Sequence, residues 1–360
     1  MMLRAAIGAA LLAGVGLATT AAGQTRVLIP GGVLRGTVTD TTGGAGLSYA
    51  LVTVVRLDRR SFANERGAFA IAGLKPGPER LRVQQIGYAP LELNLMLVDP
   101  GKDAAAVDQL IITLGARVQV LPDLVVTAAD IRTYRQPESC VAPANALTGG
   151  SAQLVIDQAV TNADRIVALE QDYPFIVTFE HVREARDSTD AVVGRWVDTI
   201  PLNPAHRAWY RRGAVLPRPP LFRPQEAHYF TMGDLARVEF QRAHCVWYIG
   251  TDSTEAGPVH RLVFEPAPGV KSADWAGMLQ FDRESFQLAR SDAWLVQVGS
   301  RAEIRMARCA VRYGGDVPTI IHERIALCQT DLGRPDGVTS RDVYRVLSTR
   351  FLGQRPGENR

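Results

Sequence analysis

Lysine is nearly absent from this chain of 360 residues. Lys75, Lys102 and Lys271 are the only ones, so 40 − 3 = 37 of the basic residues are arginines. The formal net charge is only +3, and the basic residues are scattered along the chain. A nucleic-acid-binding surface needs a clustered basic stripe, so nucleic acid is not expected as a partner.

Long apolar runs are missing after the first residues. No later run approaches the roughly 18 apolar residues of a membrane-spanning helix. At the start, Arg4 precedes an apolar run from Ala5 to Ala18, and Ala21-Ala22-Gly23 offers a small-residue cleavage site before Gln24. This pattern predicts a cleavable secretory signal peptide over residues 1–23. We therefore expect a periplasmic or secreted protein with no transmembrane segment after signal removal.

Cysteine is sparse, with four residues in all. They are Cys140, Cys245, Cys309 and Cys328. Export to an oxidising compartment makes two disulfides plausible, with three connectivities available. We expect Cys140–Cys245 and Cys309–Cys328. The second pair requires a loop from about Gly314 to Ile320, because a tight turn at Gly314-Gly315 would put the two cysteines out of register.

The first third of the chain is a series of short apolar runs separated by glycine and proline. Strands are predicted at Val33–Thr39, Ala50–Leu57, Phe69–Ile71, Leu81–Gln85, Leu91–Leu97, Val107–Leu114 and Val118–Thr127. Turns such as Lys75-Pro76-Gly77 separate them. This alternation favours a seven-stranded β-sandwich over residues 33–128.

Three motifs in this region resemble those of the carboxypeptidase regulatory-like domain. They are Gly67-Ala68-Phe69, Gly77 with Leu81, and Gln85-Ile86-Gly87-Tyr88. The resemblance implies a prealbumin-like sandwich, also called a carbohydrate-binding-like fold, as in the N-terminal module of TonB-dependent receptors. Leu121–Ala128 resembles the segment that leads into the receptor plug, but only 360 − 128 = 232 residues follow. That length is too short for a plug and a barrel of about 22 strands.

The second part of the chain changes its period. Residues 129–150 are expected to be a linker, and apolar residues at helical spacing predict a helix over Ser151–Glu170, with Ser151 as N-cap. Strands are predicted at Phe175–Arg183, Val192–Ile200, Ala236–Ile249, Val259–Pro266, Trp275–Phe281, Phe286–Val298, Ala302–Tyr313 and Ile320–Gln329. We therefore expect a helix plus antiparallel sheet over residues 151–335, and a C-terminal tail over residues 336–360.

Two segments of this sheet domain carry a further resemblance. His260–Pro266 and Asp274–Leu288 resemble a segment of uncharacterised envelope proteins that carry the same N-terminal module. They are also similar to the half-barrel of lipoprotein carriers of the LolA and LolB type. This second resemblance implies a cavity for a hydrophobic ligand.

A proline-rich loop over residues 201–225 is the predicted binding element. Its prolines exclude a regular helix or a central strand. Its candidate ligand-binding residues are Trp209, Tyr210, Phe222, Arg207 and Arg211. Long loops in compact domains are usually functional or disordered, so a binding lid and an insertion that covers a sheet edge both remain open. Four tryptophans in predicted strands could bind sugars or acyl chains from one face, or could be core residues: Trp196, Trp247, Trp275 and Trp294.

Catalytic motifs are not found. His181-Val-Arg-Glu184 has the His-x-x-Glu spacing of zinc carboxypeptidases, but in a strand residues three apart face opposite sides. His322-Glu323 lacks a second histidine four residues on, where Ala326 stands. No nucleophile elbow, phosphate loop or dinucleotide fingerprint occurs. We therefore expect no enzyme, no metal site and no cofactor.

These features predict a non-enzymatic envelope protein, periplasmic or secreted, whose β-sandwich acts as a binding or interaction module. Its partner would be an unknown envelope protein, a glycan or a lipid-like ligand. Three alternatives follow from the resemblances. They are a carbohydrate-binding protein, a LolA/LolB-like carrier of a hydrophobic ligand and, with the least support, a carboxypeptidase-related enzyme.

The signal peptide gives the first testable prediction. N-terminal sequencing of the exported protein should show a mature chain that begins near Gly23 or Gln24, because the apolar run before them is removed by signal peptidase. A mature protein that still begins at Met1 would contradict it.

Overall fold

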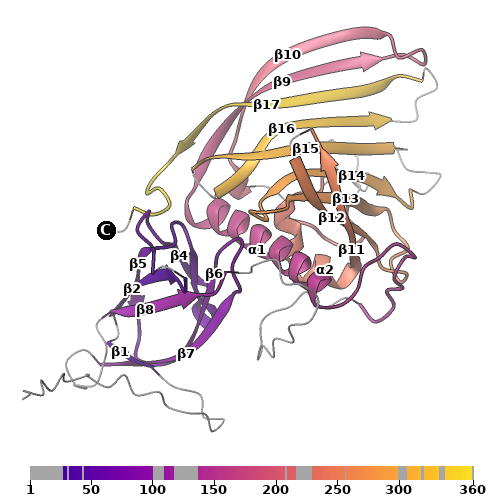
Figure 1. Ribbon diagram of the computed structural model, residues 1–360. Helices are drawn as coiled ribbons and strands as arrows, with labels where there is room; N and C mark the ends of the chain where they lie inside the picture. The colour runs from indigo at the N-terminus through magenta and orange to yellow at the C-terminus, as the bar shows by residue number, and fades with distance from the viewer. Residues whose placement is uncertain are drawn as a thin grey trace, which may run out of the picture.

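The computed structural model describes residues 27–30, 32–42, 44–99, 109–116, 137–206, 209–215, 229–255, 257–298, 306–317, 320–331 and 337–358. The fold is mainly β, as predicted: a β-sandwich is followed by a long helix and an antiparallel sheet (Figure 1). The predicted signal peptide and the expected strand at Val118–Thr127 lie outside the described residues. No helix in the described part of the chain is long and apolar enough to cross a membrane.

The sandwich consists of a five-stranded sheet, in the order β1-β7-β6-β3-β4, and a three-stranded sheet, in the order β5-β2-β8. Its strands are β1 (Val27–Pro30), β2 (Gly32–Asp40), β3 (Leu51–Val54), β4 (Arg59–Phe62), β5 (Ala68–Leu74), β6 (Gly77–Gln84), β7 (Leu91–Val98) and β8 (Leu110–Leu114). The sequence did not predict β1 and β4. The expected strand Ala50–Leu57 is shorter, because a 3₁₀ helix, η1 (Val55–Leu57), follows β3.

Gly67 shows why its motif is needed in this sandwich. Its φ is +79°, and a Cβ at this position would collide with the Val38 carbonyl. Only glycine tolerates both the left-handed conformation and the close approach. The turn leads into β5, where Phe69 and Ile71 point into a core that also contains Leu34, Val38 and Leu81.

Helix α1 (Gly150–Asp172) connects the sandwich to the second sheet and is buried along most of its length. It begins one residue before the predicted start. The expected cap at Ser151 is wrong, because the N-cap is Gly149 and no side chain caps the helix. Tertiary packing on both sides stabilises α1, which is the usual source of helix stability in proteins.

The second sheet has nine strands in the order β10-β9-β17-β16-β15-β14-β13-β12-β11, and it arches over α1 (Figure 1). The strands are β9 (Phe175–Arg186), β10 (Val192–Leu202), β11 (His244–Thr254), β12 (Gly257–Pro266), β13 (Asp274–Asp282), β14 (Leu288–Val296), β15 (Met306–Val317), β16 (Ile320–Asp331) and β17 (Thr339–Phe351). All neighbouring strands in it are antiparallel.

Two sequence predictions in this sheet need correction. The expected strand Ala236–Ile249 begins instead as two short helices, η3 (Met232–Ala236) and α2 (Val238–Ala243), before β11. The expected C-terminal tail contains β17, which pairs with β9 and β16 inside the sheet. Charged residues such as Arg341, Asp342 and Arg345 interrupt the apolar residues of β17, so the segment lacks the period-two alternation that marks a strand in the sequence.

Both predicted disulfides are present. Cys309 and Cys328 lie directly opposite each other on β15 and β16, because β15 continues through Gly314 and Gly315 instead of turning there. Cys140 bonds to Cys245 at the start of β11 and so ties the linker to the sheet. The Leu147 N–H also donates to the Tyr248 carbonyl at 2.8 Å.

Polar side chains of α1 form hydrogen bonds with the backbone of the sandwich. The Gln158 amide oxygen accepts from the Gly87 N–H at 2.9 Å, and its nitrogen donates to the Tyr88 carbonyl at 3.0 Å. The buried Arg165 guanidinium donates to the Tyr49 carbonyl at 2.6 Å and lies over the Phe62 ring. Burial lowers the pKa of Arg165 to about 9.

Asn162 of the same helix forms hydrogen bonds with the backbone of the nine-stranded sheet domain. Its side-chain nitrogen donates to the Phe286 carbonyl at 2.9 Å, and its oxygen accepts from the Leu288 N–H at 3.3 Å. A shared apolar cluster joins the sandwich, α1 and β9, with members Tyr49, Leu51, Phe62, Ala168, Leu169, Tyr173, Phe175, Val177 and Phe179. The two domains are therefore packed as one unit around α1.

The variant Gln158→Leu tests this unit. Gln158 is fully buried, and a leucine at this position cannot form the hydrogen bonds that the Gln158 amide makes with the Gly87 N–H and the Tyr88 carbonyl. Each unsatisfied buried group costs about 1–3 kcal/mol, so we expect the free energy of unfolding in urea to fall by about 2–4 kcal/mol. Gln153→Leu on the same helix, whose side chain donates to Asp157, is the control and should cost less than about 1 kcal/mol. Equal losses in the two variants would contradict the prediction.

Candidate functional site

The two edges of the nine-stranded sheet differ. At β11, the linker forms a bridge between Leu147 and Tyr248 and is tied by the Cys140–Cys245 disulfide. At β10, no further strand pairs with the edge in the part of the chain that the structure describes. Unpaired main-chain groups make such an edge a template for another extended chain.

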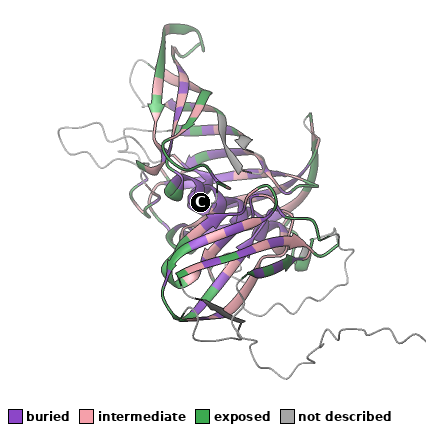
Figure 2. Ribbon diagram, turned by 90° about the vertical axis from the view of Figure 1, so that its left-hand side faces the viewer, coloured by how far each residue is buried: buried purple, intermediate pink, exposed green. Residues whose placement is uncertain are grey.

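Strand β10 is exposed on both of its faces (Figure 2). Its large apolar side chains are unusually accessible: Val193 is 59% exposed, Trp196 54% and Val197 52%. Pro201 lies near the end of β10, where the missing N–H is tolerated because the strand is at an edge. The stretch open to pairing is therefore Val193–Thr199.

The register places Trp196 at one end of a row that crosses the sheet. Directly paired residues of antiparallel strands share a face. The row continues from Trp196 on β10 through Arg183 on β9, Asp342 on β17, Cys328 on β16 and Cys309 on β15. It lies on the inner face of the sheet, the side turned toward α1, since Ala293 and Phe264 farther along the row belong to the same core cluster as α1.

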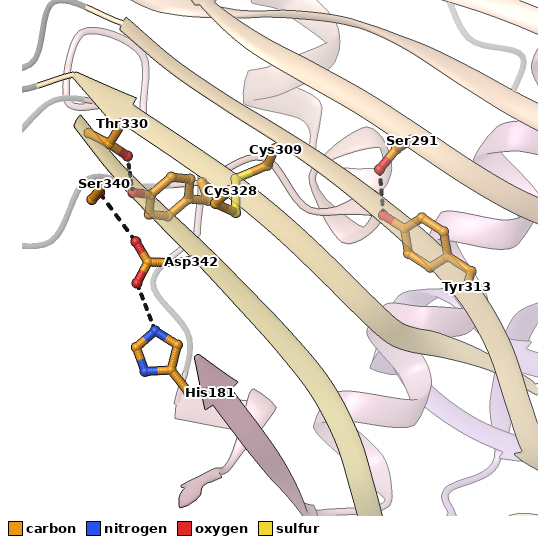
Figure 3. Close-up of a disulfide and its surroundings, with 9 residues drawn as sticks. His181, Ser291, Cys309, Tyr313, Cys328, Thr330, Ser340 and Asp342 are labelled. Carbon is orange, nitrogen blue, oxygen red and sulfur yellow. Dashed lines mark hydrogen bonds and ion pairs between the residues drawn. A yellow bond between two sulfur atoms is a disulfide. The ribbon is translucent and has the colours of Figure 1, made fainter. Parts of the chain in front are cut away.

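Asp342 fixes the side chains next to the edge (Figure 3). Its buried carboxylate accepts from Arg183 Nε at 2.7 Å and from Ser340 Oγ at 3.3 Å, and it contacts His181 Nε2 at 2.7 Å. His181 also stacks on the Tyr344 ring, with centroids 4.4 Å apart. The hydrogen bond that Arg183 donates to Asp342 raises the pKa of Arg183, whose side chain stays 54% exposed beside Trp196.

Further along the inner face, hydroxyl groups pair with one another on either side of the Cys309–Cys328 disulfide (Figure 3). Tyr229 and Thr330 hydroxyls lie 3.4 Å apart, and those of Ser291 and Tyr313 lie 2.9 Å apart. These contacts join β14 to β15 and connect β16 to the segment at Tyr229.

This arrangement is suited to binding. The edge offers main-chain hydrogen bonds, Trp196 offers an aromatic surface, and Arg183 offers a guanidinium held in place by Asp342. Two other histidines make internal contacts: His244 contacts the Phe240 and Trp275 carbonyls, and His260 contacts the Tyr248 hydroxyl at 3.0 Å. Burial lowers the pKa of His260, which favours the neutral form.

A metal site finds no support in the described part of the chain, where no group of three His, Cys, Asp or Glu residues could hold an ion. His181 and Glu184 lie on opposite faces of β9, as the strand spacing predicts. His181 contacts Asp342 on the inner face, while Glu184 accepts from Arg186 at 2.7 Å. These two residues therefore cannot bind one metal.

The predicted ligand-binding residues of the proline-rich loop are only partly described. Arg207 and Phe222 lie outside the described residues. The half-buried Trp209 ring packs under the Arg237 guanidinium at 3.6 Å, and Arg211 is exposed. Tyr210 is buried, its hydroxyl donates to Asp274 at 2.7 Å, and burial raises its pKa. A ligand-binding role for these residues stays a prediction.

The four tryptophans do not share one face. Trp275 is buried on the inner face, two residues from Gly277 in the row described above, and Trp196 also lies on that face. Trp247 and Trp294 each follow a residue of the inner row and so lie on the opposite face. The sequence could not show this, because the assignment depends on the register of all nine strands.

Comparison with known families places the first domain. Residues 33–110 match the carboxypeptidase regulatory-like domain, as the glycine motifs predicted. No curated protein matches the chain.

Several solved structures are similar to part of this chain at low scores. A DUF1329 family protein from Desulfovibrio piger is 10% identical, with 56% of this chain and 95% of that chain covered, at a TM-score of 0.31. A LolA superfamily protein from Nitrosomonas europaea is 12% identical, with 55% and 94% covered, at a TM-score of 0.29. A domain assigned to outer membrane lipoprotein sorting, from Vibrio parahaemolyticus, is 10% identical, with 55% and 94% covered, at 0.31. At scores and identities this low, only this chain's own residues can carry a functional conclusion.

Asp342→Ala tests the support beneath the edge. The change removes the acceptor shared by His181 and Arg183. We expect the free energy of unfolding to fall by about 2–3 kcal/mol, below the usual range for a broken buried pair because Arg183 can be rehydrated. The control is Asp198→Ala on β10, which removes the same charge from the same face at an exposed position. It should change the free energy of unfolding by less than about 0.5 kcal/mol. Urea denaturation measures both, and an Asp342→Ala variant as stable as the wild type would contradict the prediction.

Proposed function

We propose that this chain is a non-enzymatic binding protein of the bacterial cell envelope that captures an extended segment of a partner protein on the β10 edge. The observation that carries this proposal is the β10 edge, which has no partner strand among the described residues and carries exposed apolar side chains on both faces. An added strand would obtain affinity from main-chain hydrogen bonds and specificity from alternate side chains.

The compartment is supported by the two disulfides. Such bonds persist in oxidising compartments such as the periplasm and are rare in the cytosol. The predicted signal peptide points the same way. A periplasmic or secreted location therefore belongs to the proposal.

The edge also has features that limit nonspecific pairing. A register irregularity lies between Val192 and Gly194, Arg195 and Asp198 place charges along the strand, and Pro201 ends the open stretch. Natural edge strands use such features to prevent indiscriminate aggregation. Only a segment that complements Trp196 and Arg183 would gain from pairing here, which suits selective capture.

In this proposal, the β-sandwich, which the sequence predicts to be an interaction module, mainly positions the nine-stranded sheet. One part of the sandwich, around Tyr49 and Phe62, is packed against α1 and β9, so it is not free to bind a partner. The sandwich would act as the rigid base that positions the sheet, and its remaining surface would be available for further contacts. A glycan or lipid-like ligand stays an alternative.

Photocrosslinking tests the proposal. A benzoylphenylalanine at Trp196, in the full chain exported by its native host, should yield one discrete protein adduct. The same probe at Leu347 is the control, because that side chain is 56% exposed but lies on the interior strand β17. A synthetic peptide with the crosslinked partner sequence should then slow amide hydrogen exchange in Val193–Thr199, since those amides would enter a new ladder.

Three results would contradict the proposal. They are an equal yield of the adduct from both probe positions, an adduct with the mass of a glycan or lipid, and a peptide that leaves exchange in β10 unchanged. The first would indicate nonspecific contact, and the second would support one of the alternatives.

A further inference from the structure

One face of the nine-stranded sheet, here called the outer face, is turned away from α1 (Figure 1). This face has an ordered pattern of charge. Its pattern follows from the pairings, because residues directly opposite in antiparallel strands share a face. The pattern is continuous over the six strands β10, β9, β17, β16, β15 and β14.

The middle row of this face is apolar over five strands. It consists of Val197, Val182, Val343, Leu327 and Ala310, with Asp292 at its β14 end. Val197 is exposed and the other four apolar residues are half-buried, so no layer covers them in the described part of the chain.

Arginines line both sides of the apolar row. The row on one side contains Arg195, Arg341 and Arg308, and the row on the other side contains Arg345, Arg312 and Arg290. Three carboxylates lie among these six arginines. Glu184 accepts from Arg186, Glu180 from Arg345 at 3.0 Å, and Asp292 from Arg290 at 2.7 Å. Positive charge is therefore in excess on this face.

The spacing is regular. Arg195, Arg341 and Arg308 stand on every second strand of the sheet order, which places them about 9.6 Å apart because neighbouring strands are about 4.8 Å apart. Each arginine row lies two residues from the apolar row, or about 6.8 Å along the strands. In the second row, Arg345 and Arg312 are also two strands apart, whereas Arg290 lies on β14, directly beside Arg312. The outer face thus has a row of guanidinium groups on each side of an apolar strip.

We propose that the outer face docks onto an anionic phospholipid surface. A lipid leaflet presents the complementary pattern, with repeated anionic headgroups above apolar chains. Arginine side chains can lay their apolar stems along the surface while their guanidinium groups reach phosphate. The exposed Trp294, in the row of Arg308 and Arg341, adds an aromatic ring of the kind enriched at membrane interfaces.

An acidic protein would match the charge but not the repetition. A protein partner presents a particular shape with a few anchoring side chains, and the outer face offers two repeated rows of arginines instead. This inference does not rest on what binds at β10, because most of the outer face belongs to β9, β17, β16, β15 and β14, and only Arg195 and Val197 are common to the two surfaces.

Vesicle sedimentation tests the inference with the full mature chain. Phosphatidylcholine vesicles that contain about a third phosphatidylglycerol should bind the protein at about 0.1 M salt, and pure phosphatidylcholine vesicles should not. The triple variant Arg308→Gln, Arg312→Gln, Arg345→Gln should bind about 100-fold more weakly, given the usual contribution of each basic residue near an anionic surface. Its circular dichroism and melting temperature should match those of the wild type, since all three residues are exposed.

A second triple variant distinguishes vesicle binding through the outer face from attraction that depends only on the net charge of the protein. Arg35→Gln, Arg66→Gln and Arg242→Gln remove three exposed arginines from the sandwich and from α2, and should leave vesicle binding within about twofold of wild type. Equal losses in the two triple variants would overturn the proposal in favour of nonspecific attraction. Absence of binding to the anionic vesicles would also overturn it, and binding to polyglutamate alone would indicate an acidic protein as partner.

Discussion

The burial of polar side chains on α1 is the constraint on which the rest of the structure depends. A buried amide or guanidinium must be hydrogen-bonded, because leaving it unpaired costs more than the bond itself contributes. On α1, the partners are backbone groups of different domains: Tyr49 and Tyr88 in the sandwich, and Phe286 in the sheet domain. The helix therefore fixes the position of the sandwich relative to the nine-stranded sheet.

This arrangement decides which surfaces are free. The helix and its short neighbours cover the inner face of the sheet from β11 to β15, and the linker occupies the β11 edge through Leu147 and Cys140. What remains accessible in the described part of the second domain is the β10 edge with its inner-face neighbour Arg183, and the outer face. Both proposed binding surfaces are consequences of how α1 packs.

Local signals in the sequence were sufficient for the elements that local chemistry determines. Gly67 predicted its turn because only glycine fits there, and the 3.6 period predicted α1. The Cys309–Cys328 pair was expected if the chain did not turn at Gly314-Gly315, and the register of the β15–β16 hairpin provides this. The site could not be predicted in the same way. An edge strand is defined by the lack of a partner on one side, and in the described part of the chain β10 is the edge while β9 is interior, because β17 pairs with the other side of β9.

Strand β17 links the two free surfaces through its register. Arg341 and Asp342 are neighbours in sequence, and the pleat sends them to opposite faces: Asp342 supports Arg183 beneath the edge, and Arg341 stands in the outer arginine row. A shift of one residue would turn Arg341 toward the inner face and leave His181 and Arg183 without their carboxylate. The buried contact of Asp342 with His181 opposes that shift, because the misplaced register would bury an arginine with no partner. One ion-pair cluster on the inner face therefore also holds the outer row of guanidinium groups in place.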